Sequence, residues 1–123
     1  MKFMDSSIWL AHLFEANEKI SILFEEEDLI FSSILTIFEV KRKLEKEGFD
    51  SNKIFNSIDL IKKTSIVINL DEAIVNKAVE VSIEKKLSSM DSLIYASSLI
   101  TGAKFVTADN DFRGLEYVEV ISK

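Results

Sequence analysis

The sequence predicts an α/β fold in which a central, mostly parallel β-sheet is flanked by helices. Short apolar segments rich in β-branched and aromatic residues alternate with longer segments whose apolar residues recur at helical spacing. Sheets connected in this way are covered by helices on both faces. The 123-residue chain has no proline and only three glycines, so no flexible linker is expected. We therefore expect one domain over residues 1–123.

The N-terminal half predicts two strands and four helices. Residues 2–5 form a strand that stops at Asp5, after which Ser6 or Ser7 can cap a helix that carries Ile8 to Phe14. Residues 18–26 follow as a second helix and residues 29–33 as a second strand. Helices are then expected over residues 36–47, where Gly48 suits the stop, and over residues 51–63.

The C-terminal half continues the alternation. Residues 65–70 are apolar and β-branched, as in a strand, and Asp71 is suited to capping a helix that runs to about residue 86. Gly102 closes a further helix over residues 89–101. The last two strands are expected over residues 104–106 and 117–121.

The composition indicates the cellular compartment in which the protein is expected. The absence of cysteine excludes disulfides and thiolate metal sites and suits a reducing cytoplasm. No apolar run approaches the ~20 residues that span a bilayer, and the N-terminus does not resemble a secretory signal. We therefore expect a cytoplasmic protein without a membrane segment.

The formal net charge of −6 argues against nucleic-acid binding by bulk charge alone, although a bound metal ion would change the local charge. Basic residues group at positions 41–43 and 46, at 62–63 and at 85–86. Solvated helix faces are the expected explanation, and a positive rim that guides a phosphate backbone is the alternative. Aromatic side chains that can stack RNA bases have apolar neighbours, which favours packing instead: Trp9, Phe14, Phe24 and Phe38.

Four acidic residues lie where an apolar strand ends or a helix begins: Asp5, Glu39, Asp91 and Asp109. In open α/β sheets, ligands bind beyond the carboxyl ends of the strands, so these residues can meet at one edge. Clustered carboxylates repel one another unless a cation is bound, and hard divalent cations prefer oxygen ligands. The pattern therefore indicates a metal site and phosphodiester chemistry.

Each carboxylate also has an ordinary structural explanation. Asp5 fits a turn or cap, and Asp109 with Asp111 fits an ordinary polar turn. Thr36 and Glu39 fit a capping box, as do Ser88 and Asp91. What favours a functional Asp91 is the apolar helix start around it, where a free charge is costly.

The ordered set of motifs resembles the PIN-domain family, in particular its small prokaryotic members exemplified by VapC toxins. The resemblance spans nearly the whole chain and is carried by four segments: Phe3-Met4-Asp5-Ser6-Ser7, Thr36-Ile37-Phe38-Glu39-Val40, Met90-Asp91-Ser92-Leu93-Ile94-Tyr95-Ala96 and Val106-Thr107-Ala108-Asp109-Asn110-Asp111-Phe112. It implies a three-layer fold with a parallel sheet between helices. It also implies a metal-dependent ribonuclease.

The same resemblance implies roles for individual residues. Asp5, Glu39, Asp91 and Asp109 would form the catalytic acidic quartet. Mg²⁺ or Mn²⁺ would be held by Asp5, Asp91 and Asp109, with Asp111 as a further acidic ligand. Ser6 and Thr107 match supporting hydroxyls near the site. A VapC-like toxin would further have RNA as its substrate, a cognate antitoxin protein as its partner and a homodimeric state.

Two other classes of function remain open at this point. One is a PIN-like binding module without catalysis, which would lack a saturable Mn²⁺ site. The other is a receiver-type signalling domain, which requires adjacent acids after the first strand and a lysine after the last inner strand. Here serines follow Asp5, and Lys104 precedes its strand, so the receiver is disfavoured. The RNA target and the number of metal ions are open as well.

Overall fold

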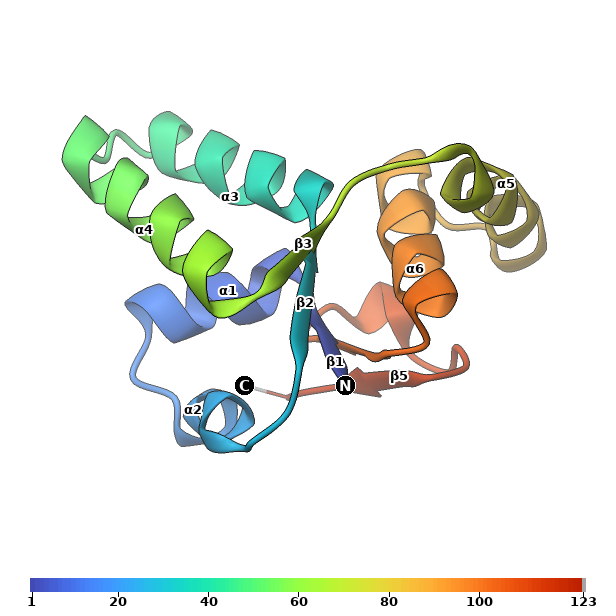
Figure 1. Ribbon diagram of the computed structural model, residues 1–123, viewed down its shortest axis with the longest axis horizontal. Helices are drawn as coiled ribbons and strands as arrows, with labels where there is room; N and C mark the ends of the chain where they lie inside the picture. Colours follow the sequence, from blue (N-terminus) through green and yellow to red (C-terminus); the bar gives the residue numbers. More distant parts are fainter. Residues whose placement is uncertain (123) are drawn as a thin grey trace.

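Five parallel strands form the centre of the computed structural model, which describes residues 1–122 (Figure 1). Their order across the sheet is β3-β2-β1-β4-β5, and all four neighbouring pairs are parallel. The expected sheet is therefore confirmed, and every recorded pair in it is parallel. The strands are β1 (Lys2–Met4), β2 (Ile30–Ser33), β3 (Ile66–Ile68), β4 (Lys104–Thr107) and β5 (Val118–Val120).

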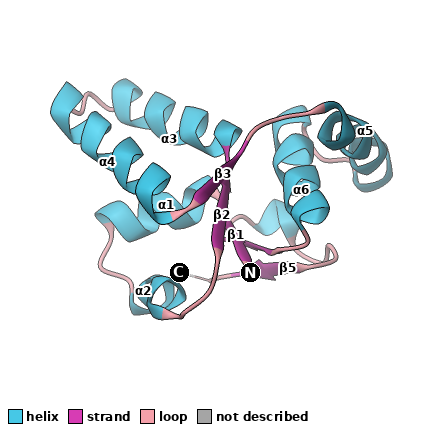
Figure 2. Cartoon of the chain, viewed as in Figure 1, coloured by secondary structure: helices cyan, strands magenta, loops and turns pink. Residues whose placement is uncertain are grey.

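Helices cover both faces of the sheet and so produce three layers (Figure 2). One layer contains α1 (Ser6–Phe14), α2 (Glu18–Glu25), α3 (Ile34–Lys46) and α4 (Ser51–Thr64). The opposite layer contains α5 (Glu72–Lys85) and α6 (Ser89–Thr101), with the short 3₁₀ helix η1 (Asn110–Phe112). Within residues 1–122, no helix combines the length and apolar character needed to cross a membrane.

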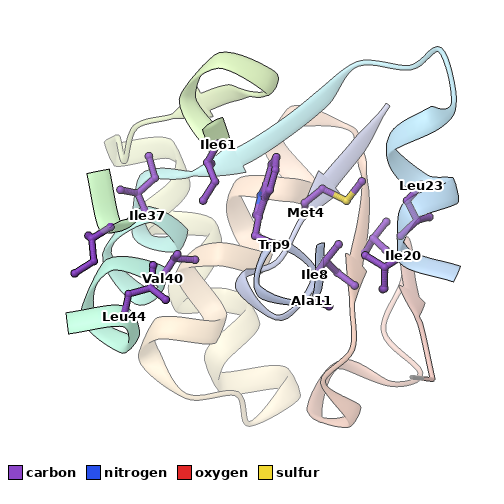
Figure 3. Close-up of a cluster of buried hydrophobic side chains, with 12 residues drawn as sticks. Met4, Ile8, Trp9, Ala11, Ile20, Leu23, Ile37, Val40, Leu44 and Ile61 are labelled. Atoms are coloured by element: carbon purple, nitrogen blue, oxygen red, sulfur yellow. The ribbon is translucent and has the colours of Figure 1, made fainter. Parts of the chain in front are cut away.

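The alternation of side chains along the strands divides the core in two. Phe3 and Phe105 are fully buried with α6 on one face, whereas Met4 and Val106, one residue further along, are buried with α1–α4 on the other. Trp9 lies in this second cluster with Met4 and Ile8 (Figure 3). Its indole Nε1 donates a hydrogen bond of 2.8 Å to Ser32 Oγ on β2, which satisfies a buried donor.

Two of the predicted helix starts are wrong. Asp5, rather than Ser6 or Ser7, is the N-cap of α1, and its carboxylate accepts from the Ser6 N–H. Ser33 caps α3 by accepting from the Leu35 N–H, so α3 starts two residues earlier than expected and Thr36 is buried inside it. In both cases an oxygen at the strand end reaches the free N–H groups first, since the helix follows the strand without a loop.

The other predicted boundaries agree closely with the structure. Asp71 caps α5 by accepting from the Ile74 N–H, as expected. Gly48 and Gly102 follow α3 and α6 with φ of 82° and 78°, the left-handed conformation that ends many helices. β3 and β5 are each shorter than predicted at both ends.

A candidate metal centre at the carboxyl ends of the strands

Asp5 lies at the carboxyl end of β1, beside the end of β4. Pairing of these strands places the Asp5 N–H 3.0 Å from the Val106 carbonyl oxygen. Thr107 Oγ1 then donates a hydrogen bond of 2.6 Å to Asp5 Oδ2. The Asp5 side chain is buried, at 6% exposure, so this hydroxyl and the Ser6 N–H at 2.9 Å replace much of the water that a carboxylate would otherwise bind.

Ser7 connects the two strand ends and was not among the predicted site residues. Its Oγ donates to Asp5 Oδ2 at 3.3 Å and accepts from the Ala108 N–H at 3.0 Å. Ser6, a predicted supporting residue, donates its backbone N–H to Asp5, and its side chain lowers the pKa of Glu39 through a hydrogen bond. The signal for Ser7 was its position two residues after Asp5, in the first turn of a helix, where a side chain can point back to the strand end.

The carboxylates of Asp91, Asp109 and Asp111 form a triplet. One oxygen from each residue lies within 4.8 Å of the corresponding oxygens of the other two. Asp91 is in the first turn of α6, where its N–H donates to Ser88 Oγ, the N-cap. Asp109 follows β4, and its Oδ1 accepts from the Asp111 N–H at 2.9 Å. The structure therefore unites three of the four predicted metal ligands, while Asp5 lies outside this triplet.

Glu39 is half-buried on α3 and faces the same group of charges. Its Oε1 is buried without a hydrogen-bond partner among residues 1–122. Burial raises the pKa of Glu39 to about 7, and the charge of Asp5 adds to this effect, while a hydrogen bond from Ser6 opposes it. Since Ser33 caps α3, the alternative of a capping box between Thr36 and Glu39 is excluded.

The remaining carboxylates are linked to this group through their electrostatics. The pKa of Asp5 is raised chiefly by burial, against the effect of its hydrogen bonds from Thr107, Ser6 and Ser7, and Asp91 raises it further. Burial likewise raises the pKa of Asp91, with contributions from the charges of Asp109 and Asp111. Predicted acids from four separate segments of the chain therefore act on one another at a single edge of the sheet.

The residues at this edge fit a hard divalent cation. The atoms that could bind the metal are all carboxylate oxygens, which suit Mg²⁺ or Mn²⁺. Two oxygens on opposite sides of a Mg²⁺ ion lie about 4.2 Å apart, since each ligand distance is 2.0–2.1 Å, so a spacing within 4.8 Å requires only a small adjustment. The unpartnered Oε1 of Glu39 adds an acceptor without a donor. His12 takes no part, because it stacks on Phe24 with ring centroids 3.8 Å apart.

A groove of about 620 Å³ opens beside the carboxylates, with Ser6 and Glu39 in its lining. Three basic side chains of α3 share this groove: Arg42, Lys43 and Lys46. One of the three basic groups in the sequence is therefore next to the acidic site. The lysines at 62–63 are in the last turn of α4, which leads to the amino end of β3 and so toward the opposite edge of the sheet.

Solved structures with the same fold come from several bacteria. The chain is similar to a toxin–antitoxin complex from Klebsiella pneumoniae, with a TM-score of 0.83, 21% identity and coverage of 98% of this chain and 97% of that chain. It is also similar to VapBC2 from Rickettsia felis bound to a promoter DNA fragment, with a TM-score of 0.81, 15% identity and 98% coverage of each chain. A third similar structure is VapC20 from Mycobacterium tuberculosis, a toxin that cleaves the sarcin–ricin loop (TM-score 0.77, 18% identity, 98% coverage of each chain).

The family assignment depends on a match to the sequence itself, because identities of this size show only a common fold. None of the curated proteins searched matches the chain with significance. A family model described as the PIN domain matches residues 2–116. That span includes the five predicted acidic residues at the carboxyl edge of the sheet. The motifs in the sequence and the three-layer fold agree with this match. The chain belongs to the PIN-domain family.

Proposed function

We propose that this protein is a metal-dependent endoribonuclease that hydrolyses phosphodiester bonds of RNA, and that it is the toxin of a toxin–antitoxin pair in the cytoplasm. The observation that carries the proposal is the carboxylate edge in a PIN-domain chain: the Asp91–Asp109–Asp111 triplet, with Asp5 and Glu39 in the same electrostatic group. A similar structure is that of a toxin that cleaves the sarcin–ricin loop, which supports RNA as the substrate class.

The proposed ligands for Mg²⁺ or Mn²⁺ are Asp5, Asp91, Asp109 and Asp111. A bound ion would supply a Lewis acid for a phosphate oxygen and would lower the pKa of water. Asp5 is held by two hydroxyl groups, since Thr107 and Ser7 both donate to its Oδ2. Precise placement of the remaining carboxylates follows from the caps of α6 and η1, because Ser88 fixes the Asp91 backbone and Asp109 is itself the cap of η1.

Glu39 is the proposed residue for orienting the attacking water. Its Oε1 has no donor among residues 1–122, so it can accept a hydrogen bond from water without breaking an existing contact. With a pKa of about 7, this carboxyl group can hold or release a proton near neutral pH. The charges of Asp5, Asp91 and Asp109 all raise the pKa of Glu39, which supports a role for Glu39 beside the proposed metal ligands.

Two protein partners belong to the proposal. A cognate antitoxin is supported by the similarity to toxin–antitoxin complexes, and an arginine from such a partner would pair well with the carboxylates. A homodimer is supported by an exposed apolar row on α5 at four-residue spacing: Val75, Val79 and Ile83, at 44%, 54% and 74% exposure. Sedimentation equilibrium of the purified chain would show a monomer if this row has no partner copy.

RNA digestion with and without Mn²⁺ tests the proposal directly. We expect Asp91→Asn to lower metal-dependent cleavage by at least about 100-fold, because the charge on one ligand of the ion is removed. Asp59→Asn is the matched control, since Asp59 forms an ion pair with Lys63 on α4 and takes no part in the site. Equal cleavage by the parent and Asp91→Asn would contradict the site assignment.

The same preparation separates the two other classes of function. A non-catalytic module would show neither Mn²⁺-dependent cleavage nor a saturable Mn²⁺ site in calorimetry. A receiver-type domain would instead become phosphorylated on one aspartate by a small phosphodonor. The order and spacing of the four acidic motifs, together with the Asp91–Asp109–Asp111 triplet, favour the nuclease over the binding module and the receiver.

A further inference from the structure

The outer surface of α3 carries an aromatic ring and two cations in one row. Phe38, Arg42 and Lys46 follow one another at four-residue spacing, so they share one side of the helix and are separated by about 6 Å along its axis. All three line the groove of about 620 Å³ that Ser6 and Glu39 also line. Since α3 begins at the carboxyl edge of the sheet, this row starts beside the carboxylates and leads away from them.

The two cations in the row are available for an anionic ligand. Among residues 1–122, neither Arg42 nor Lys46 forms an ion pair within 4.0 Å, whereas the neighbouring Lys43 pairs with Glu47 at 3.3 Å. The chain as a whole carries a net charge of −6, so bulk charge does not attract a polyanion. A local positive row at the entrance of the acidic site is therefore the place where the backbone of a nucleic acid would be held.

Phe38 gives the row its second property. Phe38 is 54% exposed although it is adjacent in sequence to Glu39, at the edge of the proposed reaction site. Trp9, by contrast, is fully buried and Phe24 stacks on His12, so these two aromatic residues serve packing. An exposed ring followed by cations along a groove is the combination that binds single-stranded nucleic acid, with the base on the ring and the phosphates on the cations.

We propose that Phe38, Arg42 and Lys46 hold the single-stranded RNA segment next to the cleaved bond. The ring of Phe38 stacks on a nucleobase beside the scissile phosphodiester, and Arg42 and Lys46 pair with the phosphates that follow. The proposal rests on the ribonuclease function above and adds the residues that hold its substrate. These are positioning residues, since they act on the flanking strand and not on the reacting atoms.

Binding is measured separately from cleavage in an Asp91→Asn background with Mn²⁺. The probe is a fluorescein-labelled, unstructured RNA of about 12 nucleotides, which is within the usual range of single-strand site sizes. We expect Phe38→Ala to weaken binding roughly 10-fold or more through the loss of one base stack, and Phe38→Trp to retain it. Arg42→Gln and Lys46→Gln should each reduce the slope of log K against log salt by about 0.7.

Matched controls lie on α4. Phe55 is 67% exposed and Lys62 is exposed in the last turn, yet neither lines the groove beside Glu39. Phe55→Ala and Lys62→Gln should leave affinity and salt slope as in the parent. In cleavage assays without the Asp91 substitution, the α3 variants should raise KM more than they lower kcat, because the lost contacts are made equally in substrate and transition state.

Unchanged RNA affinity and salt slope in all three α3 variants would overturn the proposal and leave the row to a protein partner. An effect of the same size in Phe55→Ala or Lys62→Gln would overturn it too, because it would show that binding is not localised on α3. Failure of the ribonuclease function itself is distinguishable, since the parent would then show no Mn²⁺-dependent cleavage, whereas the binding comparison between the parent and the α3 variants does not depend on cleavage.

Discussion

At the scale of single residues, the decisive feature is a buried carboxylate that depends on hydroxyl groups for its hydrogen bonds. Asp5 accepts from the Ser6 N–H and from the hydroxyls of Ser7 and Thr107. Thr107 Oγ1 also accepts a hydrogen bond of 3.0 Å from the Asp109 N–H. One hydroxyl thus holds two acidic residues of the candidate site, and removing it should affect both stability and the site.

We predict that Thr107→Val lowers the free energy of unfolding by about 2 kcal/mol. Valine keeps the shape but leaves Asp5 Oδ2 with its weaker donor and the Asp109 N–H without its acceptor. Urea unfolding of the metal-free protein measures this loss. Thr64→Val is the control, since that exposed hydroxyl bonds only to the carbonyl oxygen of Leu60, and its cost should stay within about 0.5 kcal/mol. Equal costs for the two variants would show that the Thr107 hydroxyl has no special role.

Glu39 provides a prediction about pH. Its pKa is raised from 4.5 to about 7, so the folded protein binds this proton more tightly than the unfolded chain does. The resulting stability is present below about pH 4.5 and is lost as the pH rises through 7. In EDTA, Glu39→Gln should therefore raise Tm over the parent by a few degrees at pH 8, since about 1 kcal/mol corresponds to roughly 4 °C in a domain of this size.

The gain from Glu39→Gln should shrink when the pH is lowered toward 4.5, because the parent carboxyl group then becomes neutral as well. Glu45→Gln, an exposed position on the same helix, serves as the control and should show no such pH dependence. A constant difference in Tm between Glu39→Gln and the parent across this range would contradict the assigned pKa.

At the scale of elements, the starts of three helices or turns carry the carboxylates. Asp5 caps α1, Asp91 is in the first turn of α6, and Asp109 caps η1. Negative charge is favourable at a helix N-terminus because of the free N–H groups and the helix dipole. The N-termini of α1 and α6 therefore offset part of the repulsion within the cluster before any cation binds.

The cap of α6 can be tested at Ser88. Ser88→Ala should cost about 1 kcal/mol of stability, and Ser88→Gly only a few tenths, because the Asp91 N–H loses its side-chain acceptor. We also expect Mn²⁺ affinity to fall up to about 10-fold, since Asp91 loses the contact that orients it. Ser89→Ala, one residue further on, should change neither urea unfolding nor Mn²⁺ titration. Unaltered Mn²⁺ affinity in Ser88→Ala would show that the cap of α6 does not orient Asp91 for metal binding.

At the scale of the whole molecule, parallel topology brings distant segments to one edge. The order β3-β2-β1-β4-β5 places β1 in the centre, next to β4. The carboxyl ends of these two strands therefore meet, although they are about a hundred residues apart in the sequence. The same topology gathers negative charge that repels itself in the metal-free state. A divalent cation that binds there should therefore stabilise the folded molecule more than a monovalent salt of equal ionic strength does.

We predict that Mn²⁺ at about 100 times its Kd stabilises the protein by roughly 2.7 kcal/mol, a rise in Tm of about 10 °C. Thermal unfolding in Mn²⁺ and in NaCl of equal ionic strength measures the specific part. Asp91→Asn should lose most of the Mn²⁺ effect while its Tm in NaCl stays at or above that of the parent, because one repelling charge has been removed. An identical Mn²⁺ shift in the parent and the variant would mean that the ion binds elsewhere.

Sequence patterns predicted the elements because they depend on local physics. The apolar period and the caps at Asp71 and Gly102 act within a few residues, and the structure agrees with them. The caps at Asp5 and Ser33 were mispredicted because each helix follows directly on a strand, so that the last polar residue of the strand end caps the helix before the predicted residue does. Pattern alone does not decide which residue is the cap.

By itself, the sequence determined the three-layer α/β class, the family and the acidic residues at strand ends and helix starts. Only the tertiary structure decided which of them lie together: Asp111 joins Asp91 and Asp109, and Ser7 rather than Ser6 provides the hydroxyl to Asp5. The same holds for α3, where a basic group became a row beside the carboxylates. The physical reason is range, since these contacts join segments up to a hundred residues apart and depend on strand order and register, which no local pattern encodes.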